Sequence, residues 1–161
     1  MKKPFIAIMF FVSAGLFAQE KVQLYDPPAD AQHDLQQVIL QAGQKDKHVL
    51  VQVGGNWCPW CVKLHGFFQS EPVIDSILEA DYILVRINYS KENKNPLVMK
   101  TLGFPQRFGF PVLVVLDTAG TRLHTQDTGY LEFDKGYDAE KVKRFLLGWN
   151  RASLDPVNYQ K

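Results

Sequence analysis

The sequence predicts an α/β domain in which a central mixed sheet is flanked by helices. Three apolar runs of strand length, at residues 48–53, 82–88 and 112–116, are separated by segments whose apolar residues recur at helical spacing. A turn after the third run leads into a fourth strand, which indicates a hairpin. This order predicts parallel strands that are joined by helices, with an antiparallel strand at the edge of the sheet.

The first helix and the first two strands follow from the spacing of apolar residues. Between Leu35 and Ala42, apolar residues recur at i, i+3, i+4 and i+7, which predicts a helix that ends near Gly43. The runs at residues 48–53 and 82–88 are almost continuously apolar. Such runs are typical of strands that are covered on both faces, so we expect both strands to be buried inside the sheet.

Three prolines stand where helices are expected to begin. Pro59 follows the first strand, and Pro72 precedes a stripe of apolar residues at helical spacing. Pro96 follows Asn95, a residue type that suits the capping position. Proline fits the first position of a helix because that position needs no backbone N–H donor. We expect the helix after Pro96 to be short, since Gly103 would end it.

The last part of the predicted sheet is a hairpin, which a helix follows. Pro111 opens the apolar run at residues 112–116, and the Asp-Thr-Ala-Gly sequence at residues 117–120 is typical of a turn. This turn leads into an expected strand at residues 121–128. Asp138 is then expected to cap the final helix, whose apolar residues recur at helical spacing.

The chain contains two cysteines, and both lie at the start of the helix that follows the first strand. Cys58 directly precedes Pro59, and Cys61 lies three residues after Cys58. The free backbone N–H groups and the dipole of a helix N-terminus stabilise a thiolate. We therefore expect Cys58 at the helix cap, exposed and acidic, with Cys61 one turn inward and near enough to form a disulfide with it. This arrangement predicts a redox-active dithiol.

Two other interpretations of this cysteine pair are weaker. A structural zinc site needs about four ligands, and the sequence has no second cysteine pair to supply them. A purely structural disulfide would close a very short loop and remove little entropy from the unfolded chain. Its stabilisation would be far less than the ~3 kcal/mol expected for a loop of ~15 residues. The redox interpretation is therefore preferred.

Residues 1–18 have the pattern of a secretory signal peptide. Lys2 and Lys3 precede a short apolar stretch, and the sequence becomes polar directly after Ala18. Cleavage after Ala18 is therefore expected, although residues 13–15 also fit the small-residue rule for cleavage. The alternative is an uncleaved membrane anchor, but the apolar stretch is short for a span, which needs about 20 residues. We expect a periplasmic or secreted protein without stable membrane insertion after cleavage.

The remaining chain is expected to form one domain between an extended arm and a tail. We assign residues 19–29 to the arm, residues 30–150 to the domain and residues 151–161 to the tail. The 18 basic and 17 acidic residues give a net charge of +1, and no basic run indicates binding to nucleic acid. With no cysteine beyond the pair, the domain depends on its hydrophobic core for stability. We expect a monomer that binds protein or small-molecule partners.

Three separate segments of the chain are similar to segments of a known family. They are the Trp-Cys-Pro-Trp-Cys sequence at residues 57–61, the Gly-Phe-Pro-Val sequence at residues 109–112, and residues 138–149. By these segments the chain resembles the thioredoxin superfamily, and in particular exported thioredoxin-like proteins with an extra N-terminal helix. The segments match, in order, the active-site motif, the segment that bears a cis-proline, and the closing helix. The resemblance extends from about Asp30 to Asn150 and implies a thioredoxin fold.

The resemblance implies a thiol–disulfide oxidoreductase that exchanges disulfides with protein substrates and requires no metal or organic cofactor. Cys58 would be the nucleophile, and Cys61 would resolve the mixed disulfide that Cys58 forms. Pro111 would be cis and face the pair, which would turn the backbone of Phe110 toward the sulfurs to bind an extended substrate. The residues expected to contact the substrate are Trp57, Pro59, Trp60, Phe110 and Pro111.

The chain departs from thioredoxin at positions that bear on mechanism. Pro59 and Trp60 stand between the cysteines in place of Gly-Pro, and this dipeptide influences the reduction potential. Gln52 stands where thioredoxin has a buried acid, so acid–base assistance by that route is expected to be missing. Arg86 matches a nearby lysine and either favours the thiolate or pairs elsewhere. We favour a reductase that a redox partner recharges over an oxidase, because the chain lacks room for the large helical insertion of the dedicated oxidase.

A non-catalytic binding module of the same fold is the alternative function. His65 lies four residues after Cys61 and seven after Cys58. The three side chains would then share one helix face and offer two sulfurs and a nitrogen to a soft metal such as copper. A surface histidine is the simpler interpretation of His65. A module of this class would hold the metal, or dock a partner protein, without turnover.

Overall fold

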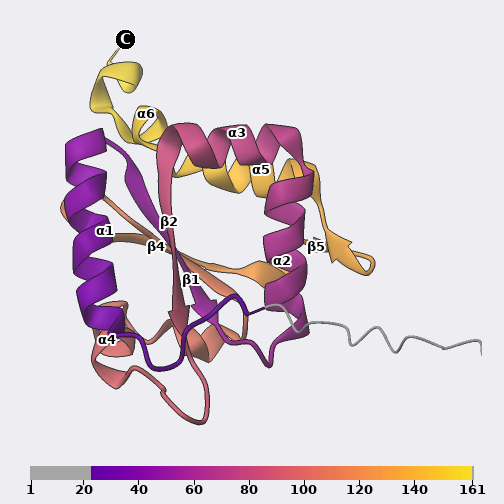
Figure 1. The fold of residues 1–161 in the computed structure, drawn as a ribbon. Helices are drawn as coiled ribbons and strands as arrows, with labels where there is room; N and C mark the ends of the chain where they lie inside the picture. Colours follow the sequence, from indigo (N-terminus) through magenta and orange to yellow (C-terminus); the bar gives the residue numbers. More distant parts are fainter. Residues whose placement is uncertain (1–22, 161) are drawn as a thin grey trace, which may run out of the picture.

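The computed structural model describes residues 23–160, which form a mixed four-stranded sheet with helices on both faces (Figure 1). The strand order is β2-β1-β3-β4. The strands are β1 (His48–Gly54), β2 (Tyr82–Asn88), β3 (Val112–Leu116) and β4 (Arg122–Asp127). The helices are α1 (Ala31–Lys45), α2 (Pro59–Ser70), α3 (Pro72–Asp81), α4 (Pro96–Thr101), α5 (Ala139–Gly148) and α6 (Arg151–Leu154). The expected signal peptide at residues 1–18 lies outside the described residues.

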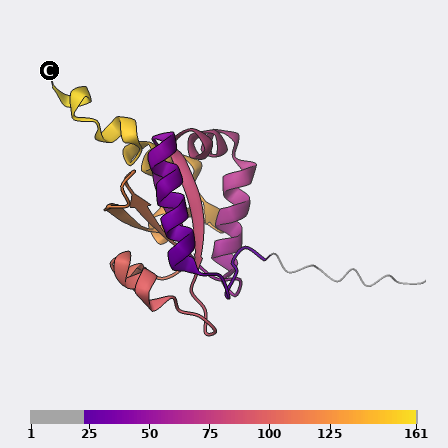
Figure 2. The same cartoon turned by 60° about the vertical axis from the view of Figure 1, so that its left-hand side comes forward.

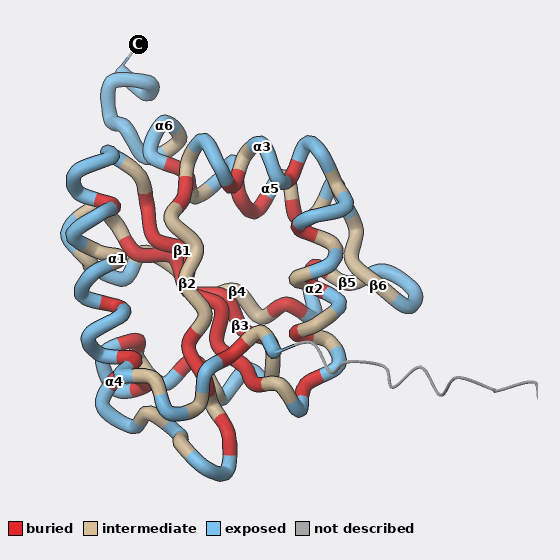
Figure 3. The backbone as a smooth tube through the Cα atoms, viewed as in Figure 1, coloured by how far each residue is buried: buried red, intermediate tan, exposed pale blue. Residues whose placement is uncertain are grey.

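Each face of the sheet has its own hydrophobic core, because successive side chains of a strand point to opposite faces. Val49 and Val51 of β1 belong to the core beneath α1 and α4. Leu50, which lies between them, belongs to the core formed with α2, α3 and α5. Every residue of β1 and β3 is buried, and Figure 3 shows these central strands as the most continuously buried part of the chain. The prediction that the first strand is covered on both faces is therefore confirmed.

The direction of β3 and the position of β2 differ from the prediction. β2 pairs with β1 in parallel, but β3 runs antiparallel to β1, so the prediction of a third parallel strand is wrong. The helix between β2 and β3, α4, has 6 residues and spans only about 9 Å, too short to carry the chain back along the sheet. The chain therefore enters β3 from the end at which β2 stops. β2 is an edge strand with half-buried central residues, so the expectation of a second fully buried strand is also wrong.

Helix α1 passes through Gly43 and ends at Lys45, so the predicted end near Gly43 is two residues too early. A Cβ atom at Gly43 would lie 3.3 Å from the carbonyl oxygen of Thr118. Glycine therefore allows α1 to pack closely against the turn between β3 and β4. The residue after Lys45, Asp46, is the C-cap, and its left-handed backbone (φ 58°) terminates the hydrogen-bond pattern.

The predicted turn and the predicted caps near the C-terminus are confirmed. Asp117 accepts hydrogen bonds from the backbone N–H groups of Ala119 and Thr121 at 2.9 and 2.7 Å, and this closes the turn between β3 and β4. Gly120 completes the turn with a φ of +85°, a conformation that favours glycine. Asp138 caps α5 by accepting a hydrogen bond from the backbone N–H of Lys141 at 2.9 Å.

Two further parts of the structure were not predicted. A small hairpin, β5 (Glu132–Phe133) and β6 (Gly136–Tyr137), lies between β4 and α5 and packs beside α2. The tail contains α6 and a 3₁₀ turn at Pro156–Tyr159, and it leads away from the domain (Figure 2). No helix within residues 23–160 has the length and apolar character to cross a membrane.

Candidate active site

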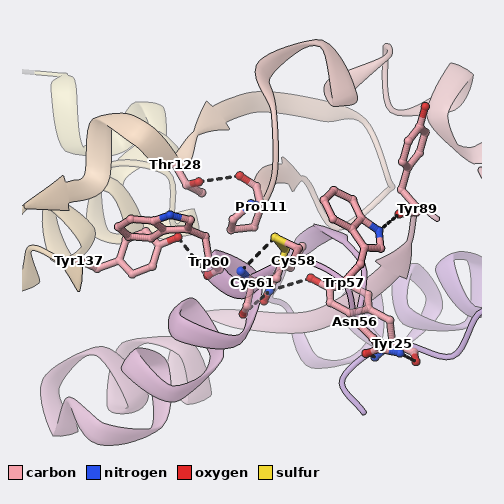
Figure 4. Close-up of a disulfide and its surroundings, with 11 residues drawn as sticks. Tyr25, Asn56, Trp57, Cys58, Trp60, Cys61, Tyr89, Pro111, Thr128 and Tyr137 are labelled. Atoms are coloured by element: carbon pink, nitrogen blue, oxygen red, sulfur yellow. Dashed lines mark hydrogen bonds between the residues drawn. A yellow bond between two sulfur atoms is a disulfide. The ribbon is translucent and has the colours of Figure 1, made fainter. Parts of the chain in front are cut away.

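Cys58 and Cys61 form a disulfide at the carboxyl end of β1, with their Cα atoms 5.3 Å apart (Figure 4). Cys58 occupies the N-cap of α2, and Pro59 occupies the first helical position. The sulfur of Cys58 accepts a hydrogen bond from the backbone N–H of Cys61 at 3.2 Å. The predicted position of Cys58 at the helix cap is therefore confirmed. In the reduced protein the same N–H group and the helix dipole would stabilise a Cys58 thiolate.

The disulfide is buried, so the prediction of an exposed Cys58 is wrong for this oxidised form. Cys58 is 3% exposed and Cys61 is fully buried. Tyr25, from the arm before α1, packs against both cysteines, and Trp60 and Phe110 cover them further. The arm and the loop before β3 thus enclose a helix N-terminus that would otherwise face solvent.

The loop before β3 bears a cis peptide bond between Phe110 and Pro111, as the resemblance implied. Figure 4 shows Pro111 beside the sulfur of Cys58. The carbonyl oxygen of Pro111 accepts a hydrogen bond from the hydroxyl of Thr128 at 2.6 Å. Gly109 allows the loop to reach this position, because its φ of +89° is unfavourable for residues with a side chain.

Aromatic side chains stand on both sides of the disulfide (Figure 4). On one side, Trp57 is 56% exposed and packs edge-on against Phe110, with ring centroids 5.4 Å apart. Its indole N–H donates a hydrogen bond to the carbonyl oxygen of Tyr89 at 2.8 Å. On the other side, Trp60 packs edge-on against Tyr137, with ring centroids 5.6 Å apart. These rings form an apolar border around the disulfide.

A groove of about 790 Å³ adjoins Trp57 on the side away from Trp60. Asn56 and Trp57 form one part of its lining, and the arm contributes Gln23 and Pro27. The segment that follows β2 forms the opposite side. That segment contributes Tyr89, Ser90, Lys91, Glu92 and Lys94, and Asn88 at the end of β2 also lines the groove. The groove is therefore mixed in character, because aromatic and charged side chains both line it.

A polar pair lies beneath the disulfide, on the inner side of β1. The side chain of Gln52 is fully buried, and its amide nitrogen donates hydrogen bonds to the hydroxyl of Tyr25 at 2.9 Å and to the carbonyl oxygen of Cys61 at 3.4 Å. No hydrogen-bond partner among the described residues reaches the amide oxygen of Gln52. Burial raises the pKa of Tyr25 well above its usual value, so the phenol stays neutral. The two polar groups beneath the cysteines, the amide of Gln52 and the phenol of Tyr25, are therefore both neutral.

Hydrogen bonds of Asn56 connect the arm to the segment that directly precedes the Trp-Cys-Pro-Trp-Cys motif. Its side-chain oxygen accepts hydrogen bonds from the backbone N–H groups of Leu24 and Tyr25 at 2.9 and 3.0 Å. Its side-chain nitrogen donates a hydrogen bond to the carbonyl oxygen of Tyr25 at 2.8 Å. The residue that precedes the Trp-Cys-Pro-Trp-Cys motif thus holds Tyr25 in place beside the cysteines.

Arg86 and His65 form a contact of their own next to this pair. Arg86 lies opposite Gln52 in the pairing of β1 with β2, and its guanidinium is 2.9 Å from Nδ1 of His65. Burial and the charge of Arg86 lower the pKa of His65, which favours a neutral ring that accepts a hydrogen bond at Nδ1. Within residues 23–160, no group of three or more His, Cys, Asp or Glu side chains is arranged to hold a metal ion. His65 therefore uses Nδ1 for its contact with Arg86.

The fold and this site define a thioredoxin-like protein, and a comparison with protein-family models agrees. The model of a thioredoxin-like family matches residues 30–118, which is more than half of the chain. The chain therefore belongs to this thioredoxin-like family. A search of the curated proteins finds no significant match.

A comparison with solved structures finds similar chains. A disulphide isomerase from Xylella fastidiosa Temecula1 is 21% identical, with a TM-score of 0.69 over 78% of this chain and 95% of that one. A thioredoxin from Thermus thermophilus is 16% identical, with a TM-score of 0.49 over 84% of this chain and 95% of that one. A DsbH oxidoreductase is 20% identical, with a TM-score of 0.40 over 68% of this chain and 78% of that one. The likeness to the disulphide isomerase and the match to the thioredoxin-like family model show that the central mixed sheet, the flanking helices and the N-terminal helix α1 are those of a thioredoxin fold.

The predicted site residues lie together, but the contribution of the arm to the site was missed. The structure gathers Cys58, Cys61, Trp57, Trp60, Phe110 and Pro111 around the disulfide, with Pro59 exposed at the start of α2. Tyr25 and Asn56 complete the site and were not predicted. Tyr25 is an aromatic residue in a polar, proline-containing arm, and that isolated position is the one sequence signal that pointed to a buried contact.

Proposed function

We propose that the protein is a thiol–disulfide oxidoreductase that acts on protein substrates in the cell envelope and works there as a reductase. The observation that carries this proposal is the Cys58–Cys61 disulfide at the N-terminus of α2, beside the cis-Pro111 loop. A structural disulfide would stabilise little with so short a loop. The same pair is well placed for exchange, because the helix N-terminus supports the thiolate of Cys58.

The proposed reaction consists of two exchanges between sulfur atoms. The Cys58 thiolate attacks a substrate disulfide, forms a mixed disulfide with one substrate sulfur and releases the other as a thiolate. Cys61 then attacks the sulfur of Cys58, and the second substrate sulfur leaves. Two electrons pass to the substrate, its two sulfurs take up protons, and the Cys58–Cys61 disulfide forms. A dithiol of a redox-recharging partner returns the pair to the reduced state.

Substrate binding is proposed for the backbone and the aromatic rings around the disulfide. The cis-Pro111 loop places the backbone of Phe110 next to the cysteines, where an extended peptide segment can form main-chain hydrogen bonds. The rings of Trp57 and Trp60 border this position and supply apolar contact without selecting one sequence. Unfolded or flexible segments of proteins with a disulfide fit such a surface.

Two features support the direction and the location of the proposed activity. Residues 89–111, which connect β2 to β3, contain the short helix α4 and the 3₁₀ turn Pro105–Phe108, and hold no large helical insertion. This favours a reductase over an oxidase that carries such an insertion. The signal-peptide pattern of residues 1–18 supports a location in the periplasm or outside the cell.

A redox titration of residues 19–161 against glutathione and dithiothreitol buffers tests the proposal. A potential near about −270 mV is expected for a reductase, whereas one near about −120 mV would identify a disulfide donor. A pair that never equilibrates with the buffers would contradict an oxidoreductase of either direction and favour the binding module.

A trapping experiment tests the proposed roles of the two cysteines. The Cys61→Ala variant is expected to accumulate mixed disulfides with envelope proteins, because the sulfur that resolves them is missing. The double variant Cys58→Ala, Cys61→Ala is the control, and it should trap none. Equal recovery from both variants would contradict the role of Cys58 as the nucleophile.

A further inference from the structure

We propose that the hydroxyl of Tyr25 donates a hydrogen bond to the thiolate of Cys61 when Cys61 resolves the mixed disulfide. This inference deepens the proposed function and rests on it. It assigns the arm before α1 a part in the reaction, because Tyr25 is carried by that arm. Gln52 is the positioning residue that orients the hydroxyl.

The contact between Tyr25 and the cysteines is close and dry. Tyr25 is 3% exposed and forms a small buried cluster with Cys58 and Cys61. A Cβ atom at Gly54 would overlap the sulfur of Cys61 and would lie 2.7 Å from the hydroxyl oxygen of Tyr25. The sulfur and the hydroxyl thus border the same small space, which glycine leaves open.

The hydrogen bonds of Gln52 determine which way the Tyr25 hydroxyl is free to donate. The amide nitrogen of Gln52 must face the carbonyl oxygen of Cys61, because that oxygen only accepts. The same nitrogen donates to the hydroxyl oxygen of Tyr25, at 2.9 Å. Tyr25 is therefore the acceptor in that bond, and its own proton remains available. None of the hydrogen bonds found within residues 23–160 uses this proton.

Among the described residues, the proton of the Tyr25 hydroxyl has no hydrogen-bond acceptor in the disulfide form. Deprotonation of Cys61 provides one. To attack Cys58, the Cys61 thiol must lose its proton to solvent, which leaves a negative charge on a fully buried sulfur. An uncompensated buried charge is costly, and hydrogen bonding to the charged form offsets this cost. The electron pair of Cys61 then forms the new bond to Cys58. The bond from Cys58 to the substrate breaks, and the departing substrate sulfur takes up a proton from solvent.

Tyr25 acts in this step as a neutral donor and not as a base. Burial raises the pKa of its hydroxyl, so the proton stays on oxygen throughout the physiological range of pH. The nearby positive charge of Arg86 acts against that increase in the pKa of Tyr25. Positive potential at this position also favours a thiolate over a thiol.

Tyr25→Phe tests the proposal, because it removes the hydroxyl and keeps the ring. The first measurement is the pH profile of Cys61 alkylation in the reduced protein, with the modified residue identified by mass spectrometry. A lost hydrogen bond to a charged group is expected to move the midpoint of this profile up by about one pH unit. This readout needs no substrate, so it tests Tyr25 even if the proposed function fails.

The second measurement is the rate at which substrate leaves a preformed mixed disulfide on Cys58. At pH 7 the thiolate fraction of Cys61 is expected to fall about tenfold, while the more basic thiolate is about threefold more nucleophilic. The net release should therefore slow by about three- to fourfold at pH 7, whereas at pH values above both midpoints the variant should release substrate at least as fast as the wild type. A merely structural defect would slow release at every pH.

Tyr82→Phe is the matched control. Tyr82 is also a buried tyrosine, and its hydroxyl donates a hydrogen bond to the carbonyl oxygen of Leu146 at 2.5 Å, at the opposite end of β1 from the disulfide. This variant should keep the wild-type alkylation profile of Cys61. Asn56→Ala is the second test variant, because it loosens the arm and retains the hydroxyl, and it should shift the profile in the same direction as Tyr25→Phe. A folded Tyr25→Phe protein with the wild-type profile and release rate would overturn the proposal.

Discussion

The hydroxyl of Thr128 donates a hydrogen bond of 2.6 Å to the carbonyl oxygen of Pro111. Thr128 is 2% exposed and Pro111 is also buried, so the bond lies away from water. It joins the end of β4 to the cis-proline loop that borders the disulfide. The position of the loop is therefore fixed by a polar contact, in addition to the packing of Phe110 against the cysteines.

Replacing Thr128 by valine should lower the free energy of unfolding by about 1–3 kcal/mol, because the buried carbonyl of Pro111 then has no donor. Urea denaturation of the oxidised protein measures this loss. Thr101→Val is the matched control, since Thr101 bonds to the carbonyl of Leu97 at 3.1 Å on the exposed side of α4. Its effect is expected to stay within about 0.5 kcal/mol. Equal losses in the two variants would show that the hydrogen bond to Pro111 contributes no more to the free energy of unfolding than the exposed bond of Thr101.

Replacing Gly54 by alanine should destabilise the site, because the added Cβ would overlap the sulfur of Cys61 and lie 2.7 Å from the Tyr25 hydroxyl. We expect a loss of about 1–3 kcal/mol in the free energy of unfolding, as for other overpacked cores. Gly66→Ala is the control, because no atom lies within 4 Å of its Cβ position in α2. That variant should gain about 0.5–1 kcal/mol from helix propensity. A neutral Gly54→Ala variant would contradict the close contact.

The elements that sequence could predict are those with a local cause. Pro59 and Asp138 mark helix starts through the chemistry of one or two residues, and the structure confirms both. The apolar run of β3 was also found, but its direction was not. The direction of a strand depends on the end of the sheet at which the preceding connection stops. The apolar pattern of a parallel strand does not differ from that of an antiparallel strand buried on both faces.

The residues of the candidate site also fall into those that a local motif predicts and those that it does not. Cys58, Cys61 and Pro111 stand in short motifs that indicate their position beside a helix start and a strand start. Tyr25 contacts Gln52 and Asn56 across 27 and 31 residues of chain, and no periodic pattern connects them. The burial of Cys58 was missed for this reason, because it depends on Tyr25 of the arm.

Truncation of Trp57 should weaken substrate binding more than it weakens the fold. Trp57 is 56% exposed, and its ring stands beside Phe110 at the edge of the disulfide site. Trp57→Ala is expected to raise KM for a disulfide-bonded, unfolded protein by about fivefold or more, with a smaller change in kcat. Leu40→Ala removes a 60% exposed side chain from α1, away from the site, and serves as the control. An unchanged KM in Trp57→Ala would argue against this side as the binding surface.

His65 should make the protein less stable in mild acid. Burial and the charge of Arg86 lower its pKa from the usual 6.5, so the unfolded chain binds the proton more readily than the folded protein. Stability is therefore retained above about pH 6.5 and declines as the pH falls toward the lower pKa of the folded state. His65→Gln should reduce this decline between pH 7.5 and pH 5, as measured by urea midpoints. His33→Gln, at an exposed site on α1, should leave the decline unchanged. A His65→Gln variant with the wild-type decline would show that His65 is not its source.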